Sequence, residues 1–507
     1  MSFFPYNIKR NITGGDTRII TGYSTEKRYL SLPQKQLHCL EPTGFELAMP
    51  VASKPPFRYI PLMPTPRPYS PHDASITLPA LQFLHSPPGE QLRAHIADLL
   101  ATHPSPTVAD IAALRKSHPP DVVHAALTLG QAQKKAHAKF PQLPYLWAVP
   151  EALEQATDAA VAAHKATRFA ALNPSNILDL CAGIGGDTMA LAKIAPVTAP
   201  VIAYDLSPIR TTCLRYNLNS LELQAEIRTK DVRTLLSASK TDNPYNSDRN
   251  WGEIANDVHT LAISPPSALF HIDPARRSGG KRSPHFEDLI PGPDILLPLI
   301  EQFSGGAIKL SPAVDFDSLP AGHLEVISHD RSVVQAVLWT GKLAETFPPH
   351  TRTATIISPH HPPFSHTAQT GRSPSIPAAP GHFAYLFEVD PALTRAGLAG
   401  TFAESLGLLP LTIDGGYAAG MDAQHHVALT PFRIIMTLPY SQERVAAALS
   451  HLTEGEHGAV EVKTRGGLPG IDTDRLQLIW SAATPTRRTV LIYRQGNDVV
   501  ATIADRV

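Results

Sequence analysis

The stretch ILDLCAGIGGDTMALAK, Ile177–Lys193, decides the fold of this chain. An apolar strand carrying Asp179 runs into a glycine-rich turn, and a helix with apolar periodicity follows. The three glycines, Gly183, Gly185 and Gly186, allow a close approach of the backbone to a ligand and a sharp entry into the helix. Such a turn also occurs as a purely structural connection between a strand and a helix. Residues farther along the chain must therefore decide between a ligand-binding turn and a structural one.

Two further acids stand where predicted strands end. VIAYDLSP places Asp205 at a strand end 22 residues after Gly183, and IRTKDV places Asp231 after the next strand. A carboxylate at the first position accepts hydrogen bonds from the two hydroxyls of a ribose, and the second is placed to contact an adenine. Acids on three successive strands favour a nucleoside-binding site over a structural turn.

NAD and S-adenosylmethionine both contain an adenosine ribose, so the glycine turn must distinguish them. A dinucleotide site would read GxGxxG and bring a pyrophosphate to the helix N-terminus. This turn reads CAGIGGD, with Asp187 at the start of the helix. An acid there repels a pyrophosphate but suits a cationic sulfonium with its amino acid group, which predicts S-adenosylmethionine as the cofactor.

The pattern along the chain predicts several domains. From residue 176 to 358 short β-rich runs alternate with helical ones, which indicates a doubly wound, mainly parallel sheet. The last runs, VISHDRSVVQAVLW and TATIIS, leave little room for helices and predict an antiparallel end. We expect a disordered Pro-rich extension over 1–80, a helical N-terminal domain over 81–172, the sheet domain over 173–358, a linker over 359–383 and a small α+β domain over 384–507.

Composition limits the partners and the chemistry. With 44 Lys and Arg against 45 Asp and Glu the net charge is −1, so a polyanion must be held by a local basic patch. The three cysteines, Cys39, Cys181 and Cys213, have neither disulfide nor zinc spacing. No apolar run approaches the ~20 residues that span a bilayer. We expect a cytoplasmic protein without a metal site.

A second informative stretch is FHIDPARRSGGKR, Phe270–Arg282. Asp273 and Pro274 end a predicted strand, where the carboxylate and the backbone carbonyls can orient the hydrogens of an exocyclic amine and free its lone pair. Ala275 stands where many nucleic-acid amino-methyltransferases have a second proline. Asp273 as a mere cap of the turn is the alternative. LAISPPS at 261–267 also carries the Pro-Pro pair, but it lacks an aromatic residue and precedes the strand, so Asp273 is preferred.

The same loop concentrates positive charge next to Pro274. Four cations predict a contact with substrate phosphate, although a solvated loop would look the same; they are Arg276, Arg277, Lys281 and Arg282, with Arg276 nearest the chemistry.

Three residues farther along complete the expected site. Phe286 is the nearest candidate to stack on a base, or else a core residue. Lys309 and Ser311 end the next strand on the same rim and either line the site or simply end the strand. Since no cysteine stands at a late strand end, a covalent attack on a pyrimidine C5 is not expected.

These motifs resemble known families. Residues 177–358 resemble class I S-adenosylmethionine-dependent methyltransferases, with Cys181 at the first glycine position of their turn. DLCAGIGGDT and EQATDAAVAAHKATRF, Glu154–Phe169, resemble trimethylguanosine synthase-type enzymes. KKAHAKF, DPARR, YLFEVDPALTRAGLA and VEVKTRGG, in their order over residues 90–507, resemble bacterial methyltransferases with a C-terminal THUMP-like domain.

The resemblance implies a Rossmann-like, seven-stranded core and RNA, either tRNA or rRNA, as the substrate. It implies a cofactor site made of residues already introduced: Asp179, Cys181, Gly183, Gly185, Gly186, Asp205 and Asp231. A small-molecule or protein methyltransferase, which needs no basic rim, stays open as an alternative. So does a non-catalytic RNA-binding relative, for which Ala275 is the best argument.

Overall fold

The computed structural model describes residues 76–195, 199–237, 267–275, 277–278, 281–282, 284–370, 383–452, 459–465, 468–483 and 487–507. All of these belong to one compact unit, Tyr69–Val507. Most of the expected Pro-rich extension, with Cys39, therefore lies outside the described residues. Its expected end at residue 80 is wrong, because Ile76 is already buried and Thr77 caps the first helix.

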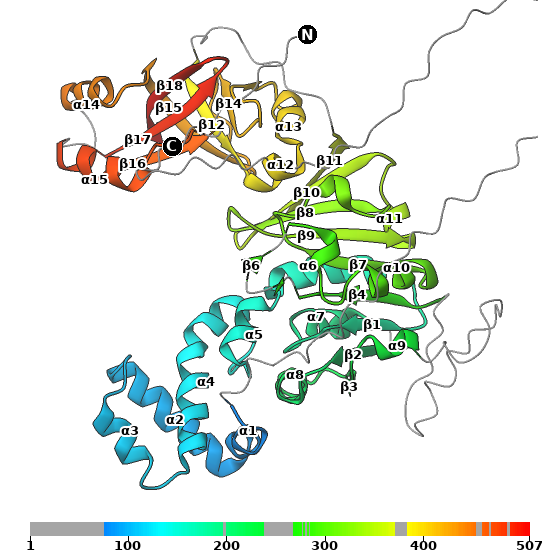
Figure 1. Ribbon diagram of the computed structural model, residues 1–507. Helices are drawn as coiled ribbons and strands as arrows, with labels where there is room; N and C mark the ends of the chain where they lie inside the picture. Colours follow the sequence, from blue (N-terminus) through cyan, green and yellow to red (C-terminus); the bar gives the residue numbers. More distant parts are fainter. Residues whose placement is uncertain are drawn as a thin grey trace, which may run out of the picture. The chain divides into compact units, whose positions relative to one another are not determined.

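Within the described residues, six helices precede the sheet, drawn from blue to cyan in Figure 1. Helices α2, α3 and α4 begin behind a Ser or Thr cap, a proline, or both, because these residues suit a helix N-terminus. Their apolar faces share one hydrophobic cluster with α7 and α8 of the sheet domain. The helices are α1 Leu78–His85, α2 Pro87–Thr102, α3 Val108–Leu114, α4 Pro120–Lys139, α5 Pro150–Gln155 and α6 Ala159–Ala170.

The central sheet has nine strands in the order β11-β10-β8-β9-β7-β4-β1-β2-β3. The bounds are β1 Ile177–Leu180, β2 Val201–Asp205, β3 Glu226–Thr229, β4 Leu269–Ile272, β7 Gly305–Leu310, β8 His323–His329, β9 Ser332–Gly341, β10 Thr351–Ser358 and β11 His361–Gln369. Strands β1 to β4 and β7 are parallel, and β9 runs against both β7 and β8. The predicted doubly wound α/β fold is confirmed.

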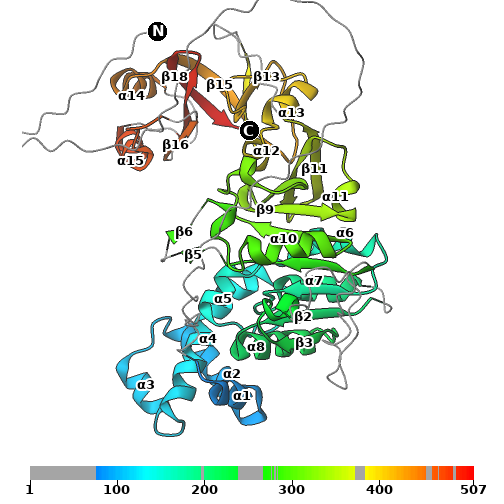
Figure 2. The same cartoon turned by 45° about the vertical axis from the view of Figure 1, so that its right-hand side comes forward.

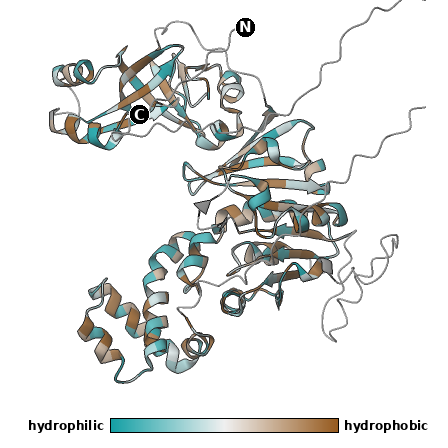
Figure 3. Cartoon of the chain, in the orientation of Figure 1, coloured by the Kyte–Doolittle hydropathy of each residue, from teal (hydrophilic) through white to brown (hydrophobic). Residues whose placement is uncertain are grey.

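Helices connect these strands and cover the sheet (Figures 1 and 2). They are α7 Gly186–Ile194, α8 Pro208–Ser220, α9 Thr234–Ser237, α10 Pro293–Gln302 and α11 Lys342–Glu345. The inner strands β1, β2, β4 and β7 are buried at every position. Figure 3 shows hydrophobic stretches along the strands of both large sheets. No helix among the described residues is both long and apolar enough to cross a membrane.

The expected antiparallel end of this sheet is confirmed for VISHDRSVVQAVLW, which forms the antiparallel pair of β8 and β9. It is wrong for TATIIS in part, because β10 pairs in parallel with β8 and antiparallel only with β11. The expected linker at 359–383 is also wrong, because strand β11 begins at its start. The sequence of this strand, HPPFSHTAQ, is rich in proline, serine and histidine and was therefore not predicted as a strand. An edge strand needs ladder hydrogen bonds on one side only and can therefore hold Pro362 and Pro363.

The C-terminal part is an α+β unit, as expected, with a seven-stranded sheet in the order β13-β14-β12-β15-β18-β17-β16. Asp390 caps α12 and accepts a 2.7 Å hydrogen bond from Ser328 in β8. The elements are β12 Tyr385–Val389, α12 Pro391–Ala396, α13 Ala399–Ser405, β13 Leu409–Pro410, β14 Tyr417–Gly420, β15 Leu429–Pro439, α14 Gln442–His451, β16 Val460–Arg465, α15 Thr473–Ala483, β17 Arg488–Gln495 and β18 Asp498–Arg506.

Candidate active site

The glycine turn after β1 contains two kinds of glycine. A Cβ on Gly185 would lie 2.2 Å from a methyl carbon of Leu214, and one on Gly186 would lie 2.8 Å from the carbonyl oxygen of Thr157. These two glycines permit close packing. Gly183, with φ +59°, would place its Cβ in open space with nothing within 4 Å. Gly183 is therefore the glycine that leaves room for a ligand.

Cys181 occupies the first glycine position of the motif and adopts φ +58°, in the left-handed region. Glycine is favoured in that conformation, since a side chain costs energy there. Burial, followed by the negative charges of Asp205, Asp273, Asp179 and Asp231, raises the pKa of its thiol well above the ordinary value. The four strand-end acids thus gather around one turn.

Asp205 lies against the turn, as the predicted ribose contact requires. Its Oδ2 accepts from the Gly183 amide at 2.8 Å and its Oδ1 from the Ser207 amide at 2.9 Å. Asp231 is paired with Arg233, whose Nε lies 2.8 Å from Oδ2. That hydrogen bond is the main reason why the pKa of Asp231 is lowered.

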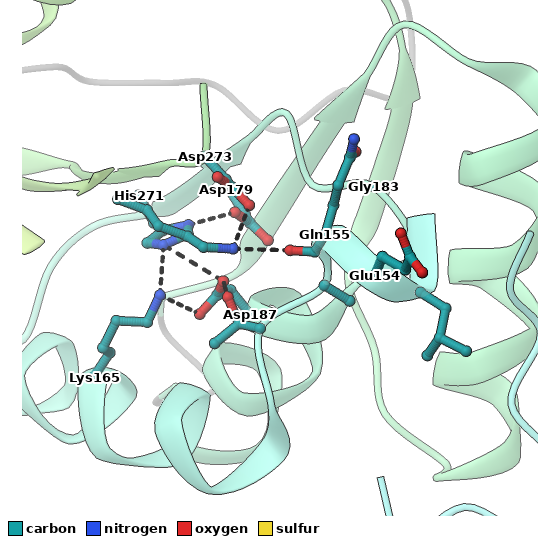
Figure 4. Close-up of polar contacts among 12 residues, drawn as sticks. Glu154, Gln155, Lys165, Asp179, Gly183, Asp187, His271 and Asp273 are labelled. Atoms are coloured by element: carbon teal, nitrogen blue, oxygen red, sulfur yellow. Dashed lines mark hydrogen bonds and ion pairs between the residues drawn. The ribbon is translucent and has the colours of Figure 1, made fainter. Parts of the chain in front are cut away.

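Asp179 and Asp187 face the protein interior. The imidazole Nδ1 of His271 on β4 lies 2.8 Å from Asp179 Oδ1, because the two residues are in register on adjacent strands. The ammonium of Lys165 on α6 lies 2.7 Å from Asp187 Oδ1 and 3.1 Å from His271 Nε2. Thr157 donates to Asp187 Oδ2 at 2.6 Å. Figure 4 shows this buried network behind the turn.

This network corrects two expectations. Burial alone would raise the pKa of Asp187, but the positive charge of Lys165 outweighs it and the pKa is lowered. Asp187 is thus an ionised partner of Lys165, and its charge is not available to a bound sulfonium. Asp179, 1% exposed, supports the turn through Thr188 and His271 rather than contacting a ligand itself.

Asp273 follows β4 and is partly exposed. Its amide donates to the Leu180 carbonyl at 3.2 Å, which ties it to the end of β1. Its Oδ2 lies 2.6 Å from the ammonium of Lys309 on β7, while the side chain keeps 24% of its surface exposed. Oδ1 has no hydrogen-bond partner among the described residues. One carboxylate oxygen is therefore fixed and the other can accept from a substrate.

The structure explains why Ala275 replaces a second proline. The Ala275 amide donates to the Ile290 carbonyl at 2.7 Å, and the Ile290 amide donates back at 2.9 Å. Proline has no amide hydrogen and would lose the first of these bonds. The backbone bridge therefore supports the loop that proline stiffens elsewhere, and Pro274 is buried beside it.

Phe286 does not serve as the expected aromatic platform. It is 3% exposed and packs in the core cluster with Leu289 and Val314. Of the basic cluster, Arg276 lies outside the described residues. So do the side chains of Arg277, Lys281 and Arg282, whose backbones pair in a two-stranded ribbon, β5 Arg277–Ser278 and β6 Lys281–Arg282.

Sequence reasoning missed the residues that join the helical layer to the turn. Asn217 on α8 is fully buried, and its amide group donates at 3.0 Å to the carbonyls of Trp147 and Ile184. Its Oδ1 accepts from the Trp147 amide at 2.8 Å. Helix α8 contains several polar residues, so nothing local marks Asn217, and its partner Trp147 lies 70 residues away.

The residues present fit S-adenosylmethionine. The open space at Gly183 lies beside a carboxylate, Asp205, that suits a ribose, and Asp273 is placed at the neighbouring strand end. Gly183, Asp205 and Asp231 would hold the adenosine part, and Asp273 would face the reacting end. No group of His, Cys, Asp or Glu in the described part of the chain can hold a metal ion.

Comparisons with known proteins agree with this interpretation. The family model "16S rRNA methyltransferase RsmB/F" matches residues 166–244, which contain the glycine turn, Asp205 and Asp231. A "Domain of unknown function (DUF8688)" matches residues 77–132. Two relatives from Mycobacterium tuberculosis, strains CDC 1551 and H37Rv, are both named uncharacterized S-adenosylmethionine-dependent methyltransferase. They are 29% identical over 339 residues, 64% of this chain and 78% of theirs.

Two further matches cover very different shares of this chain. Ribosomal RNA small subunit methyltransferase B of Proteus mirabilis is 41% identical over 124 residues, 21% of this chain and 29% of its own. A crystal structure of a methyltransferase candidate from Porphyromonas gingivalis W83 matches with a TM-score of 0.60 and 20% identity. The match covers 82% of this chain and 98% of the Porphyromonas chain. At this identity it shows that the two proteins share a fold.

The sheet order, the glycine turn with its ring of acids and the open space at Gly183 define a nucleoside-binding α/β enzyme. Together with the relatives, they identify the chain as a class I S-adenosylmethionine-dependent methyltransferase.

Proposed function

We propose that this enzyme methylates a nitrogen of a base in RNA, either exocyclic or in the ring. The observation that carries the proposal is Asp273, which has one oxygen fixed by Lys309 and the other without a partner among the described residues. It stands at a strand end among the acids that surround the glycine turn. A fixed acceptor is what an amine nitrogen needs to present its lone pair.

S-adenosylmethionine supplies a methyl group bound to a sulfonium sulfur. The lone pair of the target nitrogen forms the new N–C bond while the S–C pair returns to sulfur, leaving a neutral thioether. For an exocyclic amine, nitrogen then carries a positive charge and one proton too many. Asp273 Oδ1 accepts that proton or passes it to water. A protonated exocyclic amine is strongly acidic, so a weakly basic carboxylate suffices.

RNA as the substrate class rests on the relatives and on the loop beside Asp273. The matching family and the Proteus protein are named for ribosomal RNA, and we extend that class to this chain. Arg276, Arg277, Lys281 and Arg282 supply the local positive charge that a phosphate contact needs in a chain of net charge −1. We propose that the C-terminal unit, which resembles a THUMP-like domain, adds to RNA binding.

The described thiols do not favour attack on a pyrimidine C5. Such a mechanism needs a thiolate that reaches the base. Cys213 is fully buried in α8. Burial and the neighbouring acids raise the pKa of the Cys181 thiol, which disfavours its thiolate. Nitrogen is therefore the proposed acceptor atom.

Tritiated-methyl transfer tests the proposal directly. The purified enzyme is incubated with labelled S-adenosylmethionine and bulk rRNA, tRNA, protein extract or small molecules. We expect label in RNA and its loss in Asp273→Ala, with cofactor binding by calorimetry retained. Label only in protein or small molecules would overturn the RNA assignment. Replacing Arg276 and Arg277 by Gln separates the classes further, because a small-molecule enzyme would keep its activity.

A further inference from the structure

Lys309 is a buried cation at the edge of the reaction site. It is 4% exposed and lies on β7, the strand next to β4 in the sheet. Strand alternation places it on the same face as Ala307, away from Ile308 and Leu310, which belong to the opposite core. Its ammonium lies 2.6 Å from Asp273 Oδ2, and an isolated buried charge would be costly without this partner.

The same ammonium also holds the helical layer. It donates at 3.0 Å to the carbonyl of Gln155, the last residue of α5, 154 residues away in the sequence. Gln155 and Asp273, the two partners of this ammonium, are both labelled in Figure 4. Lys309 therefore sits between the end of α5 and the carboxylate that faces the substrate.

A second lysine makes a parallel contact without touching Asp273. The ammonium of Lys139 on α4 donates to the carbonyls of Leu153, Glu154 and Ala156 at 2.9, 3.2 and 2.8 Å. Burial, and then the charge of Lys309, lowers its pKa to about 8. Two ammonium groups thus converge on one helix end, where free carbonyls favour cations. Lys139 stabilises α5 alone, whereas Lys309 connects α5 to Asp273.

We propose that Lys309 is a positioning residue for methyl transfer, which holds Asp273 Oδ2 so that Oδ1 points to the target amine. This inference rests on the proposed function. It also favours an exocyclic amine over a ring nitrogen. A carboxylate oxygen held in a fixed direction is a hydrogen-bond acceptor that needs an N–H to accept from. An exocyclic amine keeps an N–H for the acceptor until the N–C bond forms. The Gln155 contact fixes the rotamer of Lys309, so the helical layer takes part in aligning the reacting atoms.

The test compares Lys309→Met with Lys139→Met in the full-length enzyme, using labelled S-adenosylmethionine and bulk rRNA. We expect Lys309→Met to lose about 100-fold in kcat, since a misplaced catalytic group costs this much. Cofactor affinity by calorimetry should stay close to the wild-type value. Lys139→Met leaves the Lys309–Asp273 contact in place and should lose far less kcat than Lys309→Met, and Lys309→Arg should recover part of the loss because it restores a cation.

A double-mutant cycle separates positioning from support of the fold. Asp273→Asn and Lys309→Met should each lower kcat, and their combination should be no worse than the larger single loss. If Lys309→Met does not fold, Lys309→Gln takes its place in the cycle. Additive losses, wild-type kcat in the Lys309 variant, or an equal loss in Lys139→Met would each overturn the inference.

The failure of the proposed function looks different from the failure of this inference. If the wild-type enzyme labels no RNA, the proposed function is wrong, and the same cycle is then run on whichever acceptor it does label. If the wild type labels RNA and Lys309→Met does so at the same rate, only the role of Lys309 is wrong. Product analysis by mass spectrometry decides between an exocyclic and a ring nitrogen, and a ring-methylated base would contradict the preference for an amine.

Discussion

Replacing Gly183 by alanine tests whether the open space at the turn is the cofactor cradle. Gly183 has φ +59°, and its new Cβ would meet no protein atom within 4 Å. The cost to the fold is therefore that of the left-handed backbone alone, about 1 kcal/mol. If the adenosyl group of the cofactor lies in this space, the side chain of the introduced alanine takes up part of the room that the adenosyl group needs. We expect the Kd for S-adenosylmethionine to rise at least about tenfold, or 1.4 kcal/mol.

Gly496 offers a matched control, because it also has φ +59° with nothing within 4 Å of its Cβ, but lies in the turn between β17 and β18. Gly496→Ala should lower the free energy of unfolding by a similar amount and leave the Kd unchanged. Gly185→Ala, which forces Leu214 to move, should unfold at a lower temperature than either. Calorimetric titration measures the Kd for the cofactor, and thermal unfolding measures the stability of each variant. If Gly183→Ala binds the cofactor as tightly as Gly496→Ala does, the space at Gly183 is not the cradle.

Three other variants test the structure around the site. Ala275→Pro removes the hydrogen bond to Ile290 and should destabilise the enzyme by about 1–3 kcal/mol in urea unfolding, so an unchanged midpoint would rule out the bridge. Phe286→Ala should cost about 3–5 kcal/mol as a core cavity, whereas Phe286→Leu should keep most activity; a loss of RNA binding with unchanged stability would restore Phe286 as a platform. Glu325 on β8 is fully buried, and its Oε1 lies 2.7 Å from Nε2 of His164 on α6. Burial alone would raise the pKa of Glu325, but the hydrogen bond to His164 and its other partners outweigh burial and lower the pKa to about 2. The contribution of ionised Glu325 to the free energy of unfolding is fully present above its ordinary pKa of 4.5 and is lost as the pH falls towards 2. Glu325→Gln should therefore make the free energy of unfolding depend less on pH in this acidic range.

The class of the fold and the cofactor could be predicted from the amino-acid sequence. The glycine turn, the acids that end β1 and β2 and the acid after β3, and the alternation of strands with helices are local patterns. Each follows from the conformational freedom of glycine or from the period of the apolar residues. This is why Gly183, Asp205 and Asp273 are recognisable in the amino-acid sequence alone, and why Cys181 is seen there to stand at a glycine position.

Only the tertiary structure decided how these side chains are used. Asp179 pairs with His271 across two strands, and Lys309 reaches Gln155 over 154 residues of sequence. No local pattern reports such contacts, because they depend on strand register and on where a distant helix packs. Phe286 turned inward for the same reason. The physical cause is that buried charges must find partners, and the chain brings those partners together only when the helical layer closes on the sheet.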